Sequence, residues 1–244
     1  MRNIITIAKR EFNGYFASPV AFVVIVIFLM MSAFFTFNVD KLFEGGQANL
    51  TGFFRWHPWL YLFLAPALGM RMWSEERRSG TIELLLTMPI TPWQAIVGKF
   101  LATWAVVAIA LALTFPVIMT VNYLGNPDNG IIFAGYFGSL LLAGAYLAIT
   151  AMTSAITRNQ VISFILAVVI CLLLVLAGYP PVTDFFVTWA KPWIVEGVAA
   201  FSFITHSESI QKGVLDSRDI LYFLSIIIFS LFTTSIVIRA HRAG

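Results

Sequence analysis

Apolar runs alternate with short polar segments along the whole chain. Six runs, free of charged residues away from their ends, lie at about Val20–Phe37, Trp56–Trp73, Phe100–Tyr123, Ile131–Ile156, Val161–Gly178 and Ile220–Ile238. A helix of about 20 apolar residues crosses the roughly 30 Å hydrocarbon core of a bilayer. The pattern therefore predicts an all-α polytopic membrane protein, with six transmembrane helices in a single transmembrane domain over residues 1–244. Pro66 and Pro116 should kink the second and third spans.

The residues outside the six apolar runs form three further segments. Residues 1–18 place apolar and polar side chains on opposite sides of a helix, which is typical of an amphipathic helix lying in the membrane interface. Residues 74–98 separate spans one and two (20–73) from spans three to five (99–178). Residues 179–219 are too broken for a span and too apolar for a solvated loop, so we expect short interfacial helices before span six (220–238).

The distribution of lysine and arginine orients the chain. With both termini in the cytoplasm, ten of the 15 basic residues fall in cytoplasmic segments, which favours this orientation by the positive-inside rule. Residues 74–98 are then cytoplasmic and residues 179–219 lie on the outer side. The cytoplasmic ten are Arg2, Lys9, Arg10, Arg71, Arg77, Arg78, Lys99, Arg158, Arg239 and Arg242.

The composition agrees with a bilayer environment. The chain is 59% hydrophobic and 11% charged, whereas soluble domains carry about 25% charged residues. The net charge of +3 says little about partners, and we expect no nucleic-acid partner. Cys171 is the one cysteine, which excludes an intramolecular disulfide and a cysteine-based metal site.

Catalytic chemistry is not indicated. Ionisable residues are absent from the middle of the spans, which argues against a proton-driven pump but leaves a passive pore possible. His57, His206 and His241 are expected on loops or the tail, without His-Glu-x-x-His spacing. Gly98-Lys99 is followed by Phe100 and lacks the upstream glycine of a phosphate-binding loop, so we expect no ATP hydrolysis by the chain alone.

Small residues in the fourth span are spaced for close helix packing. Ala134 and Gly138, and then Gly144 and Ala148, lie four residues apart. They indicate either close packing within the chain or a seam between two copies.

The most informative segment is the charged stretch after span two. Glu75, Glu76, Arg77 and Arg78 form a polar patch suited to a specific protein contact. Gly80 permits a sharp turn, and Ser79 or Thr81 could cap a following helix. Ile82, Leu85 and Leu86 would then present an apolar face that must be buried against head groups or a partner protein. The alternative is an ordinary basic loop on the inner side.

These residues resemble the first cytoplasmic loop of ABC-2 type transporter permeases. The family commonly shows Glu-Glu, a basic pair, Gly-Thr, a Glu-Leu-Leu run and then proline. The matching residues are Glu75, Glu76, Arg77, Arg78, Gly80, Thr81, Glu83, Leu84, Leu85 and Pro89. Residues 9–19 and 206–224 look like the family's N-terminal interfacial helix and its approach to span six. The likeness is greatest to the small permeases of gliding motility and of nitrous-oxide-reductase maturation.

The resemblance implies half of an ATP-driven exporter. Two permeases, identical or homologous, would form the pathway as a dimer and bind two separate ABC ATPase subunits, with a possible accessory membrane or periplasmic subunit. ATP and Mg would bind the ATPases, so no cofactor is expected on this chain. The expected location is the bacterial inner membrane, multi-pass, with both termini cytoplasmic. The implied coupling residues are Glu75, Glu76, Arg77, Arg78, Gly80, Thr81, Ile82, Glu83, Leu85 and Leu86, with a second contact at Arg158 and Asn159.

Two other functions remain open at this stage. A channel or a carrier independent of ATP would not need the segment from Glu75 to Pro89. A membrane-embedded enzyme would need a polar catalytic cluster near the spans, which the sequence does not indicate. Substrate identity does not follow from composition, because apolar and aromatic residues are expected in any membrane bundle.

Overall fold

The computed structural model describes residues 2–44, 48–82, 90–187 and 192–240, which contain helices and no strand. The all-α prediction is therefore confirmed for this part of the chain. The helices are α1 (Arg2–Ala17), α2 (Pro19–Phe34) with the π-helix η1 (Phe35–Val39), α3 (Thr51–Arg55), α4 (His57–Gly69), α5 (Arg71–Ser79), α7 (Pro92–Ala112), α8 (Phe115–Leu124), α9 (Asn129–Ile156), α10 (Gln160–Leu176), α11 (Pro180–Val187), α12 (Pro192–Ala199), α13 (Phe203–Gln211) and α14 (Ser217–Ala240).

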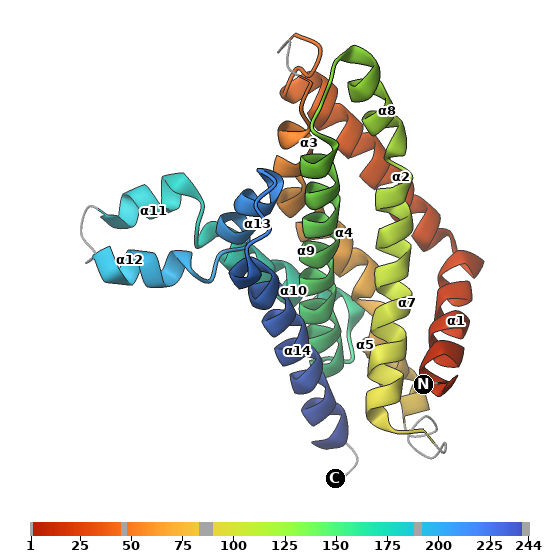
Figure 1. Cartoon of the computed structure of the whole chain (residues 1–244). Coiled ribbons are helices and arrows are strands. Elements are labelled where there is room, and N and C mark those ends of the chain that lie inside the picture. Colours follow the sequence, from red (N-terminus) through yellow and green to blue (C-terminus); the bar gives the residue numbers. More distant parts are fainter. Residues whose placement is uncertain (1, 45–47, 83–89, 188–191, 241–244) are drawn as a thin grey trace.

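The helices form a bundle around α9, which packs against α14, α10, α4, α13, α7 and α5 (Figure 1). The beginning of α1, all of α5, the beginning of α7 and the ends of α9 and α14 lie at one end of the bundle. We call this the terminal end. The opposite end holds α3 and α8, and we call it the far end (Figure 1). The pair α11–α12 projects sideways from the bundle.

Among the described residues, four helices are long and apolar enough to cross a membrane. They are Pro19–Val39, Pro92–Leu124, Asn129–Ile156 and Ser217–Ala240. A shorter apolar helix, Gln160–Leu176, matches the predicted fifth span. By length and composition, the chain is therefore a multi-helix membrane protein.

The predicted second span is divided into shorter helices. One helix was expected over Trp56–Trp73 with a kink at Pro66, but α4 continues through Pro66 and ends at Gly69. The cause of the break is Ser154 of α9. Its hydroxyl accepts from the amides of Trp73 and Ser74, both at 3.0 Å, and donates to the Met70 carbonyl at 2.8 Å. A side chain inserted among the backbone hydrogen bonds in this way interrupts a helix.

The predicted third span also differs from the structure. Its helix begins at Pro92 rather than Phe100, because Thr91 and Gln94 form a capping box there. The segment expected over residues 74–98 is shortened accordingly. Leu113 and Thr114 separate α7 from α8, and Pro116 is the second residue of α8. The ring of Pro116 fits the first turn of a helix, where no backbone N–H is needed.

The small residues of α9 serve packing within the chain. A Cβ on Gly138 would lie 2.5 Å from Cγ2 of Ile210 in α13. A Cβ on Gly144 would lie 3.1 Å from Ile227 of α14 and 3.2 Å from the indole nitrogen of Trp104 of α7. Of the two interpretations of this spacing, the structure shows close packing inside one chain.

The segment between spans five and six folds into the three short helices α11, α12 and α13. Short interfacial helices were expected here, and α13 differs from that expectation. Phe203 and Ile210 of α13 are buried in the main core, because Gly138 lets α13 approach α9 closely.

We predict that Gly138→Val destabilises the protein. The added side chain would collide with Ile210, and overpacking of this kind costs about 1–3 kcal/mol. Thermal unfolding of the purified chain would show a lowered midpoint. Gly14→Val is the matched control, because Gly14 is also helical and a Cβ there would meet nothing within 4 Å. Equal midpoints for the two variants would contradict this account of α13.

Candidate functional site

The charged segment after span two forms α5 and ends in a sharp turn. Glu75, Glu76, Arg77 and Arg78 all lie in this helix. Gly80 follows with φ +74° and ψ 2°, the left-handed conformation that favours glycine and commonly ends a helix. The turn predicted at Gly80 is therefore present.

A buried lysine joins α5 to two other helices. The ammonium of Lys99 in α7 lies 2.9 Å from Oε1 of Glu76 in α5 and 3.1 Å from Oε2 of Glu11 in α1. The Lys99 side chain is only 5% exposed, and both carboxylates are about one-fifth exposed (21% and 23%). The same ammonium lies 5.3 Å above the ring of Trp73, which is fully buried. We call Glu11, Trp73, Glu76 and Lys99 the lysine cluster.

The cluster depends on the close approach of α1 to α7. A Cβ on Gly98 would lie 2.8 Å from Cγ2 of Ile7 and 3.2 Å from the carbonyl oxygen of Ile4, so glycine is required beside Lys99. Tyr15 fastens the same two helices further along, with its hydroxyl 3.0 Å from that of Thr103. Helix α1 is therefore held against α7 by both packing and polar contacts.

The electrostatics of Glu11 show that the ion pair outweighs burial. Burial raises the pKa of Glu11, but the positive charges of Lys99 and Arg10 together lower it by more. The net result is a pKa below the ordinary value of 4.5. This carboxylate therefore stabilises the fold fully above about pH 4.5, and its contribution is lost as the pH falls through the lower folded-state pKa.

Helix α5 is also fastened to the end of α9. Besides the contacts of Ser154 described above, the guanidinium of Arg77 donates to the carbonyl of Ala155. Burial lowers the pKa of Arg77, and the nearby positive charge of Arg158 lowers it further. Asn159 begins α10, with its side chain accepting from the amide of Val161 at 2.9 Å. The structure thus brings the segment at Glu75–Arg78 together with the segment at Arg158–Asn159.

The residues implied by the resemblance differ in exposure. Glu75, Arg78, Gly80 and Thr81 are exposed, whereas Glu76 and Arg77 are partly buried in the contacts just described. Ile82 is partly buried and packs against the main core, so part of its apolar surface is covered within the chain. Glu83, Leu85 and Leu86 lie outside the described residues.

Three residues of this site were missed by sequence reasoning. Lys99 was counted among the cytoplasmic basic residues at the start of span three, and its burial within α7 was not expected. A lone lysine after Gly98, at the start of an apolar run, was the available indication. Glu11 and Ser154 gave no such indication, because their partners are distant in the sequence.

Two histidines lie differently from the prediction. His57 is buried at the start of α4, with Nδ1 2.7 Å from the hydroxyl of Ser139. His206 lies in α13, with Nδ1 2.6 Å from Oδ1 of Asp219. His241 is outside the described residues. Within the part of the chain that the structure covers, no group of three or more His, Cys, Asp or Glu residues could hold a metal ion.

Comparison with known families identifies the class of protein. The family model of the ABC-2 family transporter proteins matches residues 58–216, from the start of α4 to the approach of α14. The chain therefore belongs to this family, as the resemblance implied. No curated protein matches the chain. Family membership makes the chain a transmembrane component of an ABC transporter, a class that works with ABC ATPases.

We predict that Lys99→Met destabilises the protein by about 3 kcal/mol, the low end for breaking a buried ion pair, because Glu11 and Glu76 are partly exposed. The triple variant Glu11→Gln/Glu76→Gln/Lys99→Met should recover most of the loss, since it leaves no unpaired charge. The measurement is chemical unfolding of each variant in detergent.

Lys41→Met is the matched control for this experiment. Lys41 forms an exposed ion pair with Glu44, and losing such a pair costs at most about 1 kcal/mol. If Lys99→Met were as stable as Lys41→Met, the lysine cluster would not hold the three helices together.

Proposed function

We propose that the chain is the permease half of an ATP-driven exporter in a bacterial inner membrane. Two copies, or one copy with a homologue, would form the substrate pathway, and two separate ATPase subunits would bind at the terminal end. ATP and Mg would be held by the ATPases, and an accessory membrane or periplasmic subunit could join the far end. Family membership supports the ATPase partnership, and the structure of α5 supports its location.

In this proposal the chain crosses the membrane six times. The spans are α2 with η1, α4 with the first turn of α5 as far as Trp73, α7 with α8, α9, α10 and α14. Helix α1 lies at the inner interface, and α11 and α12 lie at the outer one. Support comes from the basic residues of α1 and α5, with Arg158 and Arg239, all of which belong to elements at the terminal end (Figure 1). The positive-inside rule then places both termini in the cytoplasm.

The observation that carries the proposal is how α5 is attached to the rest of the bundle. Its inner face is fastened to three helices, through Lys99 to α7 and α1 and through Ser154 to α9. Its outer face leaves Glu75 and Arg78 exposed. A helix that is rigidly connected on one side and charged on the other suits the transfer of a partner's motion into the bundle.

The residues from Gly80 to Leu86 would complete this contact as a coupling helix in a groove of the ATPase. Arg158 and Asn159 would provide the second, smaller contact, since Arg158 lies near Arg77. ATP binding would close the two ATPases, and α5 would pass the movement to α1, α7 and α9.

The other two functions are less well supported. A channel or ATP-independent carrier would have no need for a charged helix fastened to three others at the terminal end. A membrane-embedded enzyme would require a catalytic cluster, whereas the polar groups of the lysine cluster are engaged in ion pairs between helices.

We predict that Leu85→Asp releases or uncouples the ATPase. Burying a leucine in a groove stabilises a complex by about 1.5–3 kcal/mol, and an unpaired buried charge costs more than that gain. The measurement is co-purification of the ATPase with the permease, together with transport-dependent ATP hydrolysis.

Leu215→Asp is the control for this substitution. Leu215 is an exposed leucine (53%) that precedes α14 on the proposed outer side. It should retain the ATPase and transport. Full transport with a retained ATPase in the Leu85→Asp variant would exclude this segment as the coupling element.

A second prediction concerns orientation. Gly197→Cys in α12 should react with an impermeant thiol reagent added to intact cells, whereas Ser79→Cys in α5 should react only after the cells are opened. Both positions are exposed, and the native Cys171 is fully buried and should stay unlabelled. Labelling of Ser79→Cys from outside would reverse the proposed orientation.

A further inference from the structure

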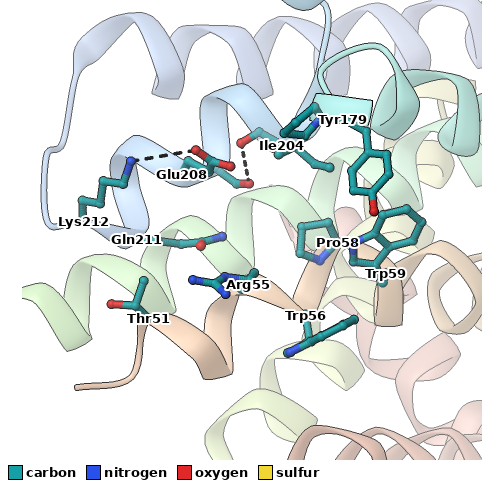
Figure 2. A pocket seen from close by; sticks show the side chains of 12 residues that line it. Thr51, Arg55, Trp56, Pro58, Trp59, Tyr179, Ile204, Glu208, Gln211 and Lys212 are labelled. Atoms are coloured by element: carbon teal, nitrogen blue, oxygen red, sulfur yellow. Dashed lines mark hydrogen bonds and ion pairs between the residues drawn. The ribbon is translucent and has the colours of Figure 1, made fainter. Parts of the chain in front are cut away.

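A cavity of about 660 Å³ lies near the far end, between α3–α4 and α13 (Figure 2). Its volume is within the range of small-molecule sites, roughly 300–1,000 Å³. It is separate from the lysine cluster. The residues that decide its chemistry are Arg55, Trp56, Trp59, Tyr179, Glu208 and Lys212.

The cavity lies where the bundle changes from longer helices to shorter ones. Helix α9 has 28 residues and is about 42 Å long, whereas α10 has 17 residues and is about 25 Å long. The two are joined by three residues at the terminal end, so α10 stops well below the far end of α9. Tyr179 and Pro180, which line the cavity, lie three and four residues beyond the end of α10.

This position corresponds to the outer boundary of the bilayer. A helix of about 25 Å nearly spans the hydrocarbon core, so its far end lies at the level of the lipid head groups. Trp59 and Tyr179 pack edge to face at that level, with ring centroids 5.5 Å apart, as expected of aromatic residues at the membrane boundary. Trp193 of α12 and Phe201, which precedes α13, are 69% and 67% exposed, which suits contact with lipid.

Charged and aromatic groups occupy different parts of the cavity. Figure 2 shows Trp59 and Tyr179 together on one side, while Lys212 and Glu208 lie on the other, with Arg55 between. An occupant that matches this lining has an ionic group at one end and an apolar body at the other.

The two cations are available to a ligand. Arg55 is held only loosely, 3.9 Å from Asp40, and Lys212 lies 3.8 Å from Glu208. Their side chains are 66% and 67% exposed. Two neutral groups of the lining are already engaged, because the amide of Gln211 donates to the Phe54 carbonyl and the hydroxyl of Ser207 donates to the backbone carbonyl of Ile204. Recognition therefore falls to the charged groups, and arginine with lysine favours phosphate.

We propose that this cavity binds an amphiphile with a zwitterionic phosphate head group. Arg55 and Lys212 contact the phosphate, Glu208 receives the head-group ammonium, and Trp56, Trp59 and Tyr179 contact the first part of the apolar chains. Calling the ligand a substrate rests on the proposed function, whereas its binding does not.

The test titrates the purified chain in non-ionic detergent with three lipids that share the same chains, followed by native mass spectrometry. Phosphatidylethanolamine should bind at least tenfold more tightly than a cationic trimethylammonium lipid, and more tightly than phosphatidylglycerol. Glycerophosphoethanolamine, the same head group without chains, should bind at least tenfold more weakly than the lipid. Equal binding of the soluble head group would show a site for free phosphate compounds and overturn the amphiphile.

Substitutions of lining residues test whether the lipid binds in this cavity. Arg55→Ala/Lys212→Ala should weaken phosphatidylethanolamine binding at least tenfold, and Glu208→Gln should abolish its advantage over phosphatidylglycerol. Lys41→Ala is the matched control, an exposed lysine (62%) outside the cavity, and should bind like the wild type. Wild-type affinity in the double variant would overturn the site.

The two proposals fail separately. Leu85→Asp should lose the ATPase and keep phosphatidylethanolamine, whereas Arg55→Ala/Lys212→Ala should keep the ATPase and lose the lipid. Retained lipid with no ATPase partner for the wild type would refute the exporter alone. A retained ATPase with no lipid bound at the cavity would refute the ligand site alone.

Discussion

Close packing against α9 is the constraint on which the other contacts depend. In a bilayer, helices associate through van der Waals contact and polar groups rather than through burial from water, so small residues at the contact matter. Gly138 admits Ile210 of α13, and Gly144 admits Trp104 and Ile227. Ser154 is small enough to enter the backbone hydrogen bonds between α4 and α5. A larger residue at any of these positions would move a neighbouring helix and whatever it carries.

The lysine cluster fixes the positions of three helices relative to one another. Apolar packing alone does not fix how three helices register with one another, because many arrangements bury similar area. One ammonium shared by Glu11 and Glu76 is satisfied only when α1, α5 and α7 are all in place. Desolvation offsets much of the attraction, so such a cluster gives specificity of arrangement more than net stability. In the proposed topology, its position at the terminal end keeps this cost outside the hydrocarbon core.

The sequence predicts the long helices well, because an unbroken apolar run leaves the backbone in lipid no alternative to a helix. The predicted span Ile131–Ile156 differs from α9 by two residues at its start. The turn at Gly80 was predicted because glycine readily adopts the positive φ that such a turn needs. The break at Met70 was not, since its cause, Ser154, lies 84 residues away along the chain. His57 was placed on a loop and the burial of Lys99 was missed for the same reason: only the fold shows which distant side chains bury them.

The two ends of α9 carry the two candidate sites. At the terminal end, Ser154 and Ala155 bind α5, where a partner ATPase would act. At the other, Gly138 supports α13, whose residues Glu208 and Lys212 line the cavity. Helices α3 and α4, which form the opposite wall of the cavity, also pack against α9. A displacement of α5 that moves α9 would therefore reach both walls of the cavity through this packing, without a separate relay of side chains.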